Sequence, residues 1–245
     1  MGKYKLIALD MDGTLLNEEK LISIPNRKAI LSALETGVTV IFSTGRGVQS
    51  AMPYVEELGL QTPIVTVNGS EVWKTPGELL KRHLMPAEQV RKLHELAVKH
   101  DTWWWAYAVT GMYNTEKWTD DIDGTQWLKF GYYTEDAAVL SEIRRSVEAW
   151  DVFEITNSHP SNIELNPKGV SKASGIAEVC KILGIQMSEV IAMGDSENDI
   201  AMIRSAGLGV AVGNAQEGVK RIADITTVTN DEHAVARIIN DYILA

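Results

Sequence analysis

Short apolar runs alternate with helical patterns along the first third of the chain. Residues 6–9 form a continuous apolar run that stops at Asp10, as a buried parallel strand does. A helical pattern then begins near Pro25 and stops at Gly37, and the elements expected after it are a strand at 38–42, a helix at 48–58 and a strand at 64–67. This alternation predicts a parallel sheet covered by helices.

The middle of the chain has a different pattern. Strand-like runs there are joined by short turns, which is typical of antiparallel pairs. The elements expected in this part are helices at 86–100 and 136–150 and strands at 103–109, 112–115, 127–133, 152–156 and 163–165. We therefore expect a small antiparallel sheet with its own helices, which forms a separate unit.

The last third returns to the first pattern. Helices are expected at 171–183 and 198–206, and strands at 190–193 and 209–212. The predicted fold class is α/β, with a doubly wound, Rossmann-like parallel-sheet core formed by residues 1–84 and 166–245. A second, α+β unit, residues 85–165, is expected to be inserted into this core.

Composition narrows the possible partners. The 245 residues are 45% apolar and 23% charged, as in an ordinary globular chain, and no apolar run approaches the roughly 20 residues of a membrane span. Membrane is therefore not an expected partner, and a start without a secretory pattern predicts a cytoplasmic protein. The net charge of -10 makes nucleic acid an unexpected partner, while a small anion could still be held locally.

Polar residues follow three of the expected core strands. They are residues 10–14 (Asp-Met-Asp-Gly-Thr), 43–46 (Ser-Thr-Gly-Arg) and 194–199 (Gly-Asp-Ser-Glu-Asn-Asp). Each segment alone is more typical of a turn or a helix cap. Ligands, however, bind beyond the carboxyl ends of the strands in open parallel sheets, and the joint occurrence of all three favours a functional site.

Several carboxylates at one sheet edge repel one another unless a cation or protons neutralise them. Mg²⁺ suits such a site because it prefers oxygen ligands and keeps waters and substrate phosphate in its shell. Lys172, at the start of the helix after residues 166–169, is expected to reach the same edge and to supply positive charge against an anion.

With these motifs, the chain resembles a phosphatase of the haloacid dehalogenase superfamily, in the Cof-type branch with a large cap inserted after the third core strand. The motifs that carry the resemblance are Asp10 to Thr14, Thr44 in Ser-Thr-Gly-Arg, Lys172 after Asn-Pro-Lys-Gly-Val-Ser, and Gly194-Asp195-x-x-Asn198-Asp199. The resemblance extends over essentially the whole chain, and it implies that the inserted α+β unit, residues 85–165, is a cap domain that sets substrate specificity.

The resemblance implies a role for each of these residues. Asp10 would be the nucleophile that becomes an aspartyl phosphate, and Asp12 the general acid and base. Mg²⁺ would be held by Asp10, Asp195 and the backbone carbonyl of Asp12, which leaves the Asp12 carboxylate free for proton transfer. The expected phosphate-binding groups are the backbone of Met11 and Gly45 with Thr44, Lys172 and Asn198, while Thr14 and Asp199 would support the site from behind.

Three consecutive tryptophans lie in one expected cap strand. Trp103, Trp104 and Trp105 must point to alternating faces, so at least one packs against the helices of the cap. Another could face the substrate, although the area that a tryptophan buries favours packing.

The expected substrate is a small phosphorylated metabolite, such as a sugar phosphate, a nucleotide or a phosphorylated cofactor or precursor, and the protein is expected to be a monomer or homodimer. Two alternatives stay open. One is a sugar phosphotransferase or mutase of the same superfamily, in which a sugar hydroxyl replaces water. The other is a non-enzymatic phospho-aspartate signalling module that keeps its phosphoryl group.

Overall fold

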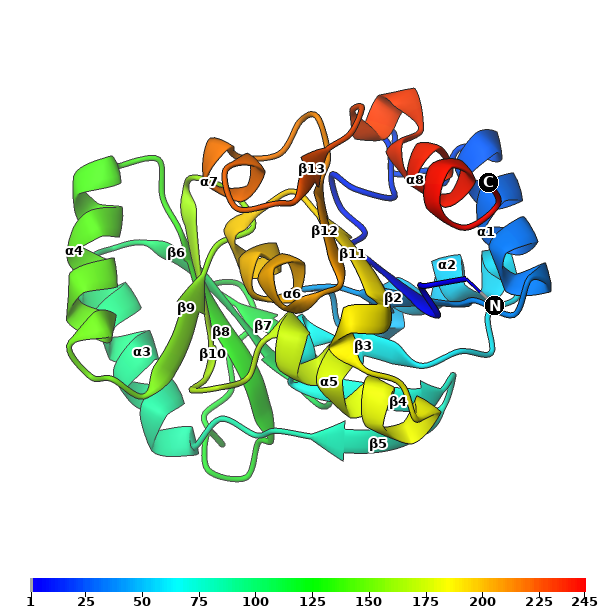
Figure 1. Ribbon diagram of the computed structural model, residues 1–245. Coiled ribbons are helices and arrows are strands. Elements are labelled where there is room, and N and C mark those ends of the chain that lie inside the picture. The colour runs from blue at the N-terminus through cyan, green and yellow to red at the C-terminus, as the bar shows by residue number, and fades with distance from the viewer. Residues whose placement is uncertain (1) are drawn as a thin grey trace.

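The computed structural model describes residues 2–245 and contains two separate sheets (Figure 1). The larger has eight strands in the order β13-β12-β11-β1-β2-β3-β4-β5, and the smaller has five in the order β7-β6-β8-β10-β9. Pairing is parallel from β13 to β3, whereas every pair of the smaller sheet is antiparallel. The predicted α/β core with an antiparallel cap is therefore confirmed.

The core elements flank the cap elements in the chain. The core strands are β1 (Leu6–Leu9), β2 (Thr39–Ser43), β3 (Ile64–Thr66), β4 (Glu71–Thr75), β5 (Glu78–Arg82), β11 (Val190–Gly194), β12 (Leu208–Ala211) and β13 (Ile225–Thr226). The core helices are α1 (Ile24–Glu35), α2 (Val48–Leu58), α5 (Lys172–Leu183), α6 (Ile200–Ser205), α7 (Glu217–Lys220) and α8 (Ala234–Tyr242). Four 3₁₀ turns occur among the described residues, η1 (Val67–Gly69), η2 (Met187–Glu189), η3 (Glu197–Asp199) and η4 (Asn230–Glu232).

The central strands β11, β1 and β2 lie side by side, so their carboxyl ends meet at one edge of the sheet. All four residues of β1 are fully buried, which explains its unbroken apolar run. Helix α1 begins as expected, since the Ser23 side chain accepts a hydrogen bond from the backbone of Asn26 and Pro25 occupies the first turn. The fold thus brings the three polar segments of the sequence together.

Three sequence expectations about the core were wrong. The structure continues the core sheet after β3 with an antiparallel hairpin, β4 and β5, so the cap follows the fifth strand of the chain and not the third. The expected helix at 198–206 is divided into η3 and the short α6, and the strand expected to reach Val67 ends at Thr66, because Val67 has a positive φ of 51°.

The cap consists of α3 (Ala87–Lys99), α4 (Ala137–Glu148), β6 (Trp103–Ala108), β7 (Gly111–Asn114), β8 (Trp127–Tyr133), β9 (Phe153–Thr156) and β10 (Asn162–Pro167). Both helices lie on the side of the cap sheet away from the core (Figure 1). Buried side chains of these helices and strands, among them Leu93, Trp104 and Phe130, form a hydrophobic cluster apart from that of the core. The boundaries 1–84, 85–165 and 166–245 stay a prediction.

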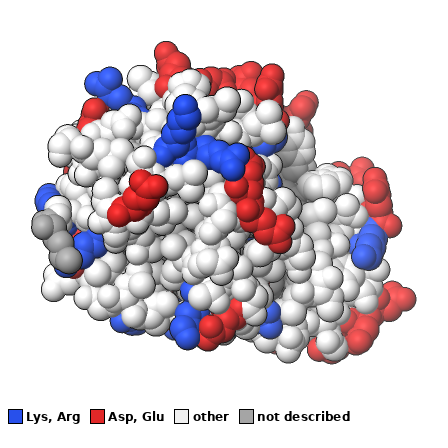
Figure 2. Space-filling model, turned by 90° about the vertical axis from the view of Figure 1, so that its right-hand side faces the viewer, with Lys and Arg blue, Asp and Glu red and all other residues white. Residues whose placement is uncertain are grey.

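Figure 2 shows the side of the molecule where both ends of the chain lie. Basic side chains occur there in small groups beside acidic ones, and most of the visible surface carries no charge. On this face the net charge of -10 is therefore not gathered into a single acidic surface.

Candidate active site

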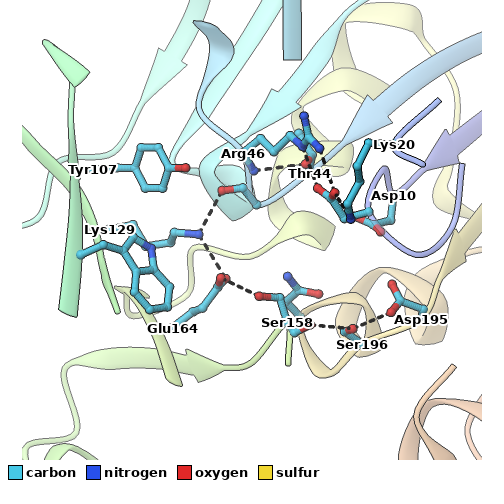
Figure 3. A pocket seen from close by; sticks show the side chains of 14 residues that line it. Asp10, Lys20, Thr44, Arg46, Tyr107, Lys129, Ser158, Glu164, Asp195 and Ser196 are labelled. Carbon is cyan, nitrogen blue, oxygen red and sulfur yellow. Dashed lines mark hydrogen bonds and ion pairs between the residues drawn. The ribbon is translucent and has the colours of Figure 1, made fainter. Parts of the chain in front are cut away.

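A cavity of about 250 Å³ lies at the carboxyl ends of β1, β2 and β11 and faces the cap sheet (Figure 3). Core residues that line it are Asp10, Asp12, Lys20, Thr44, Gly45, Arg46, Asp195, Ser196 and Asn198, and the cap contributes Trp105, Tyr107, Lys129, Ser158 and Glu164. Six of the residues predicted from the sequence, Asp10, Asp12, Thr44, Gly45, Asp195 and Asn198, therefore meet in one cavity.

Asp10 and Lys172 form a buried ion pair at the end of β1. The ammonium of Lys172 is fully buried and lies 2.6 Å from an oxygen of Asp10 and 2.6 Å from an oxygen of Asp199. Burial alone would lower the pKa of Lys172, but the charges of Asp10 and Asp199 overcome it and raise that pKa. Lys172 thus stays protonated behind Asp10, and its contact with a substrate phosphoryl oxygen stays a prediction.

Burial raises the pKa of Asp10 well above its usual range, in spite of the charge of Lys172, and the carboxylates of Asp199 and Asp195 raise it further. Burial, together with the charge of Asp199, also raises the pKa of Asp195, to about 6. Oxygens of these three carboxylates lie within 4.8 Å of one another, and among residues 2–245 the ammonium of Lys172 is the one cation that pairs with them. The cluster therefore has more carboxylates than cations.

A divalent cation fits this cluster. Besides the unbalanced carboxylates, the buried Oδ1 of Asn198 accepts no hydrogen bond from any of residues 2–245. Asp199 is the least available ligand, because one of its oxygens binds Lys172 and the other accepts the backbone N–H groups of Asp195 and Ser196 at 2.9 and 3.1 Å. Asp10 and Asp195 are thus the carboxylates best placed to hold a metal, with Asp199 behind them, and their role as metal ligands stays a prediction.

The loop after Asp10 passes close to Asp195. Gly13 has a φ of 81°, and a Cβ at this position would lie 2.8 Å from an Asp195 oxygen, so both the conformation and the space require glycine. Thr14 is fully buried, and its hydroxyl donates a 3.4 Å hydrogen bond to Asp195. The polar segments after β1 and β11 are in this way fitted to each other.

Asp12 is paired with two cations and is not free. The guanidinium of Arg46 donates to both of its oxygens, at 2.7 and 2.8 Å, and the ammonium of Lys20 donates at 3.0 Å. Burial would raise the pKa of Asp12, but hydrogen bonds from Arg46 and Lys20 lower it to about 2. The carboxylate expected to be free for proton transfer is therefore ionised and held by ion pairs in this structure.

The segment after β2 lies beside Asp12 and is fixed from two sides. The hydroxyl of buried Thr44 accepts the backbone N–H of Arg46 at 3.1 Å, and the carbonyl of Gly45 accepts a 3.0 Å hydrogen bond from Lys129 of the cap. Met11 is buried and does not line the cavity. A contact of its backbone with phosphate stays a prediction.

Sequence reasoning missed a buried polar network that joins cap and core. Glu164 accepts a hydrogen bond from Ser158 at 2.9 Å and pairs with Lys129 at 3.1 Å (Figure 3). It also accepts a hydrogen bond from Asn68 at 2.6 Å. Burial of Lys129 lowers its pKa, even though Glu164 favours the charged form. The signal available in the sequence was a charged residue inside each of two apolar strand patterns, β8 and β10.

Comparisons with known proteins agree with this geometry. The family of haloacid dehalogenase-like hydrolases matches the chain over residues 7–239. The chain therefore belongs to this family and is a phosphoric monoester hydrolase. It is 46% identical over 240 residues to the 5-amino-6-(5-phospho-D-ribitylamino)uracil phosphatase YcsE of Bacillus subtilis (strain 168), an alignment that covers 98% of this chain and 96% of YcsE.

Two further comparisons concern the same organism. The 5-amino-6-(5-phospho-D-ribitylamino)uracil phosphatase YitU of Bacillus subtilis (strain 168) is 31% identical over 274 residues, which cover 98% of each chain. The solved structure of a haloacid dehalogenase-like hydrolase from Bacillus subtilis has a TM-score of 0.89 and 25% identity, and covers 96% of this chain and 99% of that one. Within residues 2–245, no helix is both long and apolar enough to span a membrane.

Proposed function

We propose that this protein is a Mg²⁺-dependent phosphatase that hydrolyses 5-amino-6-(5-phospho-D-ribitylamino)uracil through an aspartyl phosphate on Asp10. The observation that carries the proposed substrate is the 46% identity to YcsE over nearly the full length of both chains. The compound is a phosphorylated precursor with a sugar-alcohol chain and a planar ring. It falls within the substrate class expected from the sequence.

The reaction takes place in two displacements. A carboxylate oxygen of Asp10 attacks phosphorus while the bond from phosphorus to the ribityl oxygen breaks, and the leaving oxygen takes a proton from Asp12. Water then attacks the aspartyl phosphate, Asp12 accepts the proton of that water, and inorganic phosphate leaves. Asp10 and Asp12 return to their initial states.

Positive charge makes the first attack feasible, because a carboxylate must approach an anionic phosphate. Mg²⁺ held by Asp10, Asp195 and the backbone carbonyl of Asp12 would supply electrostatic stabilisation of the phosphoryl oxygens. Lys172 keeps Asp10 oriented through the 2.6 Å ion pair. Thr44, Asn198 and the Gly45 backbone are the proposed contacts of the phosphoryl group.

Asp12 can donate a proton only after Arg46 and Lys20 release it, because a carboxylate with a pKa of about 2 carries no proton near neutral pH. A bound phosphate offers the guanidinium of Arg46 a competing anion with suitable bidentate geometry. We propose that the phosphate of the substrate draws both Arg46 and Lys20 away from Asp12, which then takes a proton from solvent and donates it to the leaving oxygen.

Phosphate release from a panel of phosphorylated metabolites tests the function. We expect the highest kcat/KM on 5-amino-6-(5-phospho-D-ribitylamino)uracil and dependence on Mg²⁺. Product analysis with a labelled phosphoryl group separates hydrolysis from the sugar phosphotransferase or mutase alternative, since only hydrolysis yields inorganic phosphate alone. The signalling module is set aside because the chain is a phosphatase.

A further inference from the structure

The cap presents an aromatic wall to the cavity. Side chains alternate along β6, so that Trp103, Trp105 and Tyr107 share the face toward the core while Trp104 points to the opposite one. Trp104 stacks on Phe130 within the cap cluster, with 5.6 Å between ring centroids. Trp105 and Tyr107 line the cavity instead.

The indole of Trp105 packs over a glycine of the neighbouring strand. Gly131 of β8 is its direct partner in the sheet, and a Cβ at Gly131 would come within 2.3 Å of the Trp105 indole. Its ring is also 5.4 Å from that of Trp103, centroid to centroid, and only 9% of Trp105 is exposed. The indole is therefore a rigid planar surface that needs little further ordering on binding.

One hydrogen-bond donor is left over beside this surface. The ammonium of Lys129 has three N–H groups. It contacts the Gly45 carbonyl at 3.0 Å and Glu164 at 3.1 Å, and among residues 2–245 no third acceptor is present. Because Lys129 lines the same cavity as Trp105, the remaining N–H can serve a carbonyl oxygen of a ligand.

The position of Lys129 also links this surface to the phosphate end of the site. Its bond to the Gly45 carbonyl reaches the loop proposed to hold the phosphoryl group, and its ammonium lies 5.2 Å from the centroid of the Tyr107 ring. Tyr107 in turn packs on Gly47, where a Cβ would lie 3.1 Å from its ring. One cavity thus contains the reacting carboxylate at one side and an aromatic wall with a free donor at the other (Figure 3).

We propose that Trp105, seated on Gly131, is the stacking surface for a planar, carbonyl-bearing ring on the leaving group, and that Lys129 donates a hydrogen bond to a carbonyl of that ring. This inference rests on the proposed function and adds the residues that select the substrate. The ligand class it defines is a phosphate ester whose alcohol carries a planar heterocycle. Sugar phosphates without such a ring leave the indole uncovered.

The test is a ratio of kcat/KM values for two substrates that share the phosphorylated chain, 5-amino-6-(5-phospho-D-ribitylamino)uracil and ribitol 5-phosphate. Wild type should prefer the ring-bearing substrate. Trp105→Ala should lower this preference by roughly tenfold to a hundredfold, the range found when a stacking aromatic residue is removed. Trp105→Phe should restore most of the preference, because a planar ring returns.

Two more variants separate stacking from folding. Tyr133→Ala is the matched control, since Tyr133 is an exposed aromatic residue of the same cap sheet that does not line the cavity and whose ring lies near that of His159, and it should keep the wild-type ratio. Gly131→Ala should lower the ratio as Trp105→Ala does, because the new methyl group displaces the indole. Thermal unfolding of each variant checks that it is folded.

The outcomes are distinguishable. If wild type does not hydrolyse the ring-bearing substrate, the proposed function fails and the inference fails with it. If wild type hydrolyses that substrate but treats ribitol 5-phosphate equally well, or if folded Trp105→Ala keeps the wild-type preference, the stacking role alone is overturned.

Discussion

Lys172 and the carboxylates around it are the residues on which the site depends most. The lysine is fully buried between Asp10 and Asp199, and both of those carboxylates are nearly inaccessible. The motifs of the sequence were sufficient to predict these three residues, because each follows a strand or begins a helix at the same sheet edge. The partners of Asp12 were missed, since Lys20 and Arg46 meet it only through the course of the loops.

Replacing Lys172 should destabilise the protein strongly. We expect Lys172→Met, in the presence of a chelator, to lower the free energy of unfolding by about 3–5 kcal/mol, because two buried carboxylates lose their counter-ion. The control is Lys168→Met, which removes an exposed ion pair with Asp151 and should cost at most about 1 kcal/mol. Urea unfolding measures both, and equal losses would speak against the buried pair.

Replacing Asp12 should separate the two displacements. We expect Asp12→Asn to lower kcat on alkyl phosphates by about 10²- to 10⁴-fold, because the leaving oxygen receives no proton. An aryl phosphate, whose leaving group needs no proton, should still give a burst of about one product per active site, followed by slow turnover. Rapid-mixing kinetics measures the burst, and unchanged turnover of both substrates would remove Asp12 from the mechanism.

At the scale of elements, helix α5 positions Lys172 through a close contact at its first turn. A Cβ at Gly69, in the 3₁₀ turn after β3, would come within 2.2 Å of the backbone oxygen of Ser171, the residue that caps α5. Val67, Asn68 and Gly69 all have positive φ values there. The turn and the helix start are thus fitted to each other by backbone contact.

The hairpin of β4 and β5 is the part of the core sheet that the sequence pattern did not predict. All five residues of the edge strand β5 are exposed or partly exposed, so it has no apolar face and no period-2 signal. The parallel strands were predictable because they are buried on both faces. Contacts between cap and core, such as Asn68 with Glu164, connect segments far apart in the chain and leave no local pattern.

Two glycine-to-alanine substitutions, one in the turn that contacts the start of α5 and one at the end of α5, should lower the free energy of unfolding by different amounts. Gly69→Ala combines an unfavourable φ of 97° with the clash against Ser171, and we expect a loss above about 3 kcal/mol. Gly184→Ala has a similar left-handed backbone, φ 67°, with open space around it, and should cost about 1–2 kcal/mol. Urea unfolding measures the stability of both variants. A Gly69→Ala protein as stable as Gly184→Ala would show that the backbone at Ser171 moves to make room for the new methyl group.

Over the whole molecule, a net charge of -10 coexists with three basic residues in one cavity. Lys20, Arg46 and Lys129 line it together with four carboxylates, although the chain has only 23 basic residues against 33 acidic ones. The fold therefore places cations beside the carboxylates where phosphate is proposed to bind, and a bound metal would be needed to reverse the sign of the charge there. Composition alone could not predict this arrangement, because it gives only the total.

Metal binding should depend on pH in a definite direction. The pKa of Asp195 is raised to about 6, so the folded protein binds more protons than the unfolded chain between about pH 4 and 6, and the metal-free protein loses stability as pH rises through that window. Mg²⁺ requires the ionised cluster. We therefore expect saturating Mg²⁺ to raise the Tm by roughly 5–10 °C at pH 8 and by much less at pH 5.

Two variants locate that effect. Asp195→Asn should remove most of the Mg²⁺-dependent rise in Tm, whereas Asp151→Asn, at an exposed carboxylate, should keep it. A rise in Tm that is equal at pH 5 and pH 8, or that survives Asp195→Asn, would place the metal elsewhere.

The central claim is that Asp10 is the nucleophile of a Mg²⁺-dependent phosphatase. The most direct measurement is phosphate release from 5-amino-6-(5-phospho-D-ribitylamino)uracil, with Mg²⁺ or with chelator, by wild type and by Asp10→Asn. We predict release by wild type only with Mg²⁺, and a loss of roughly 10⁴-fold or more in the variant. Folded wild type that releases no phosphate, or an Asp10→Asn variant as active as wild type, would contradict it.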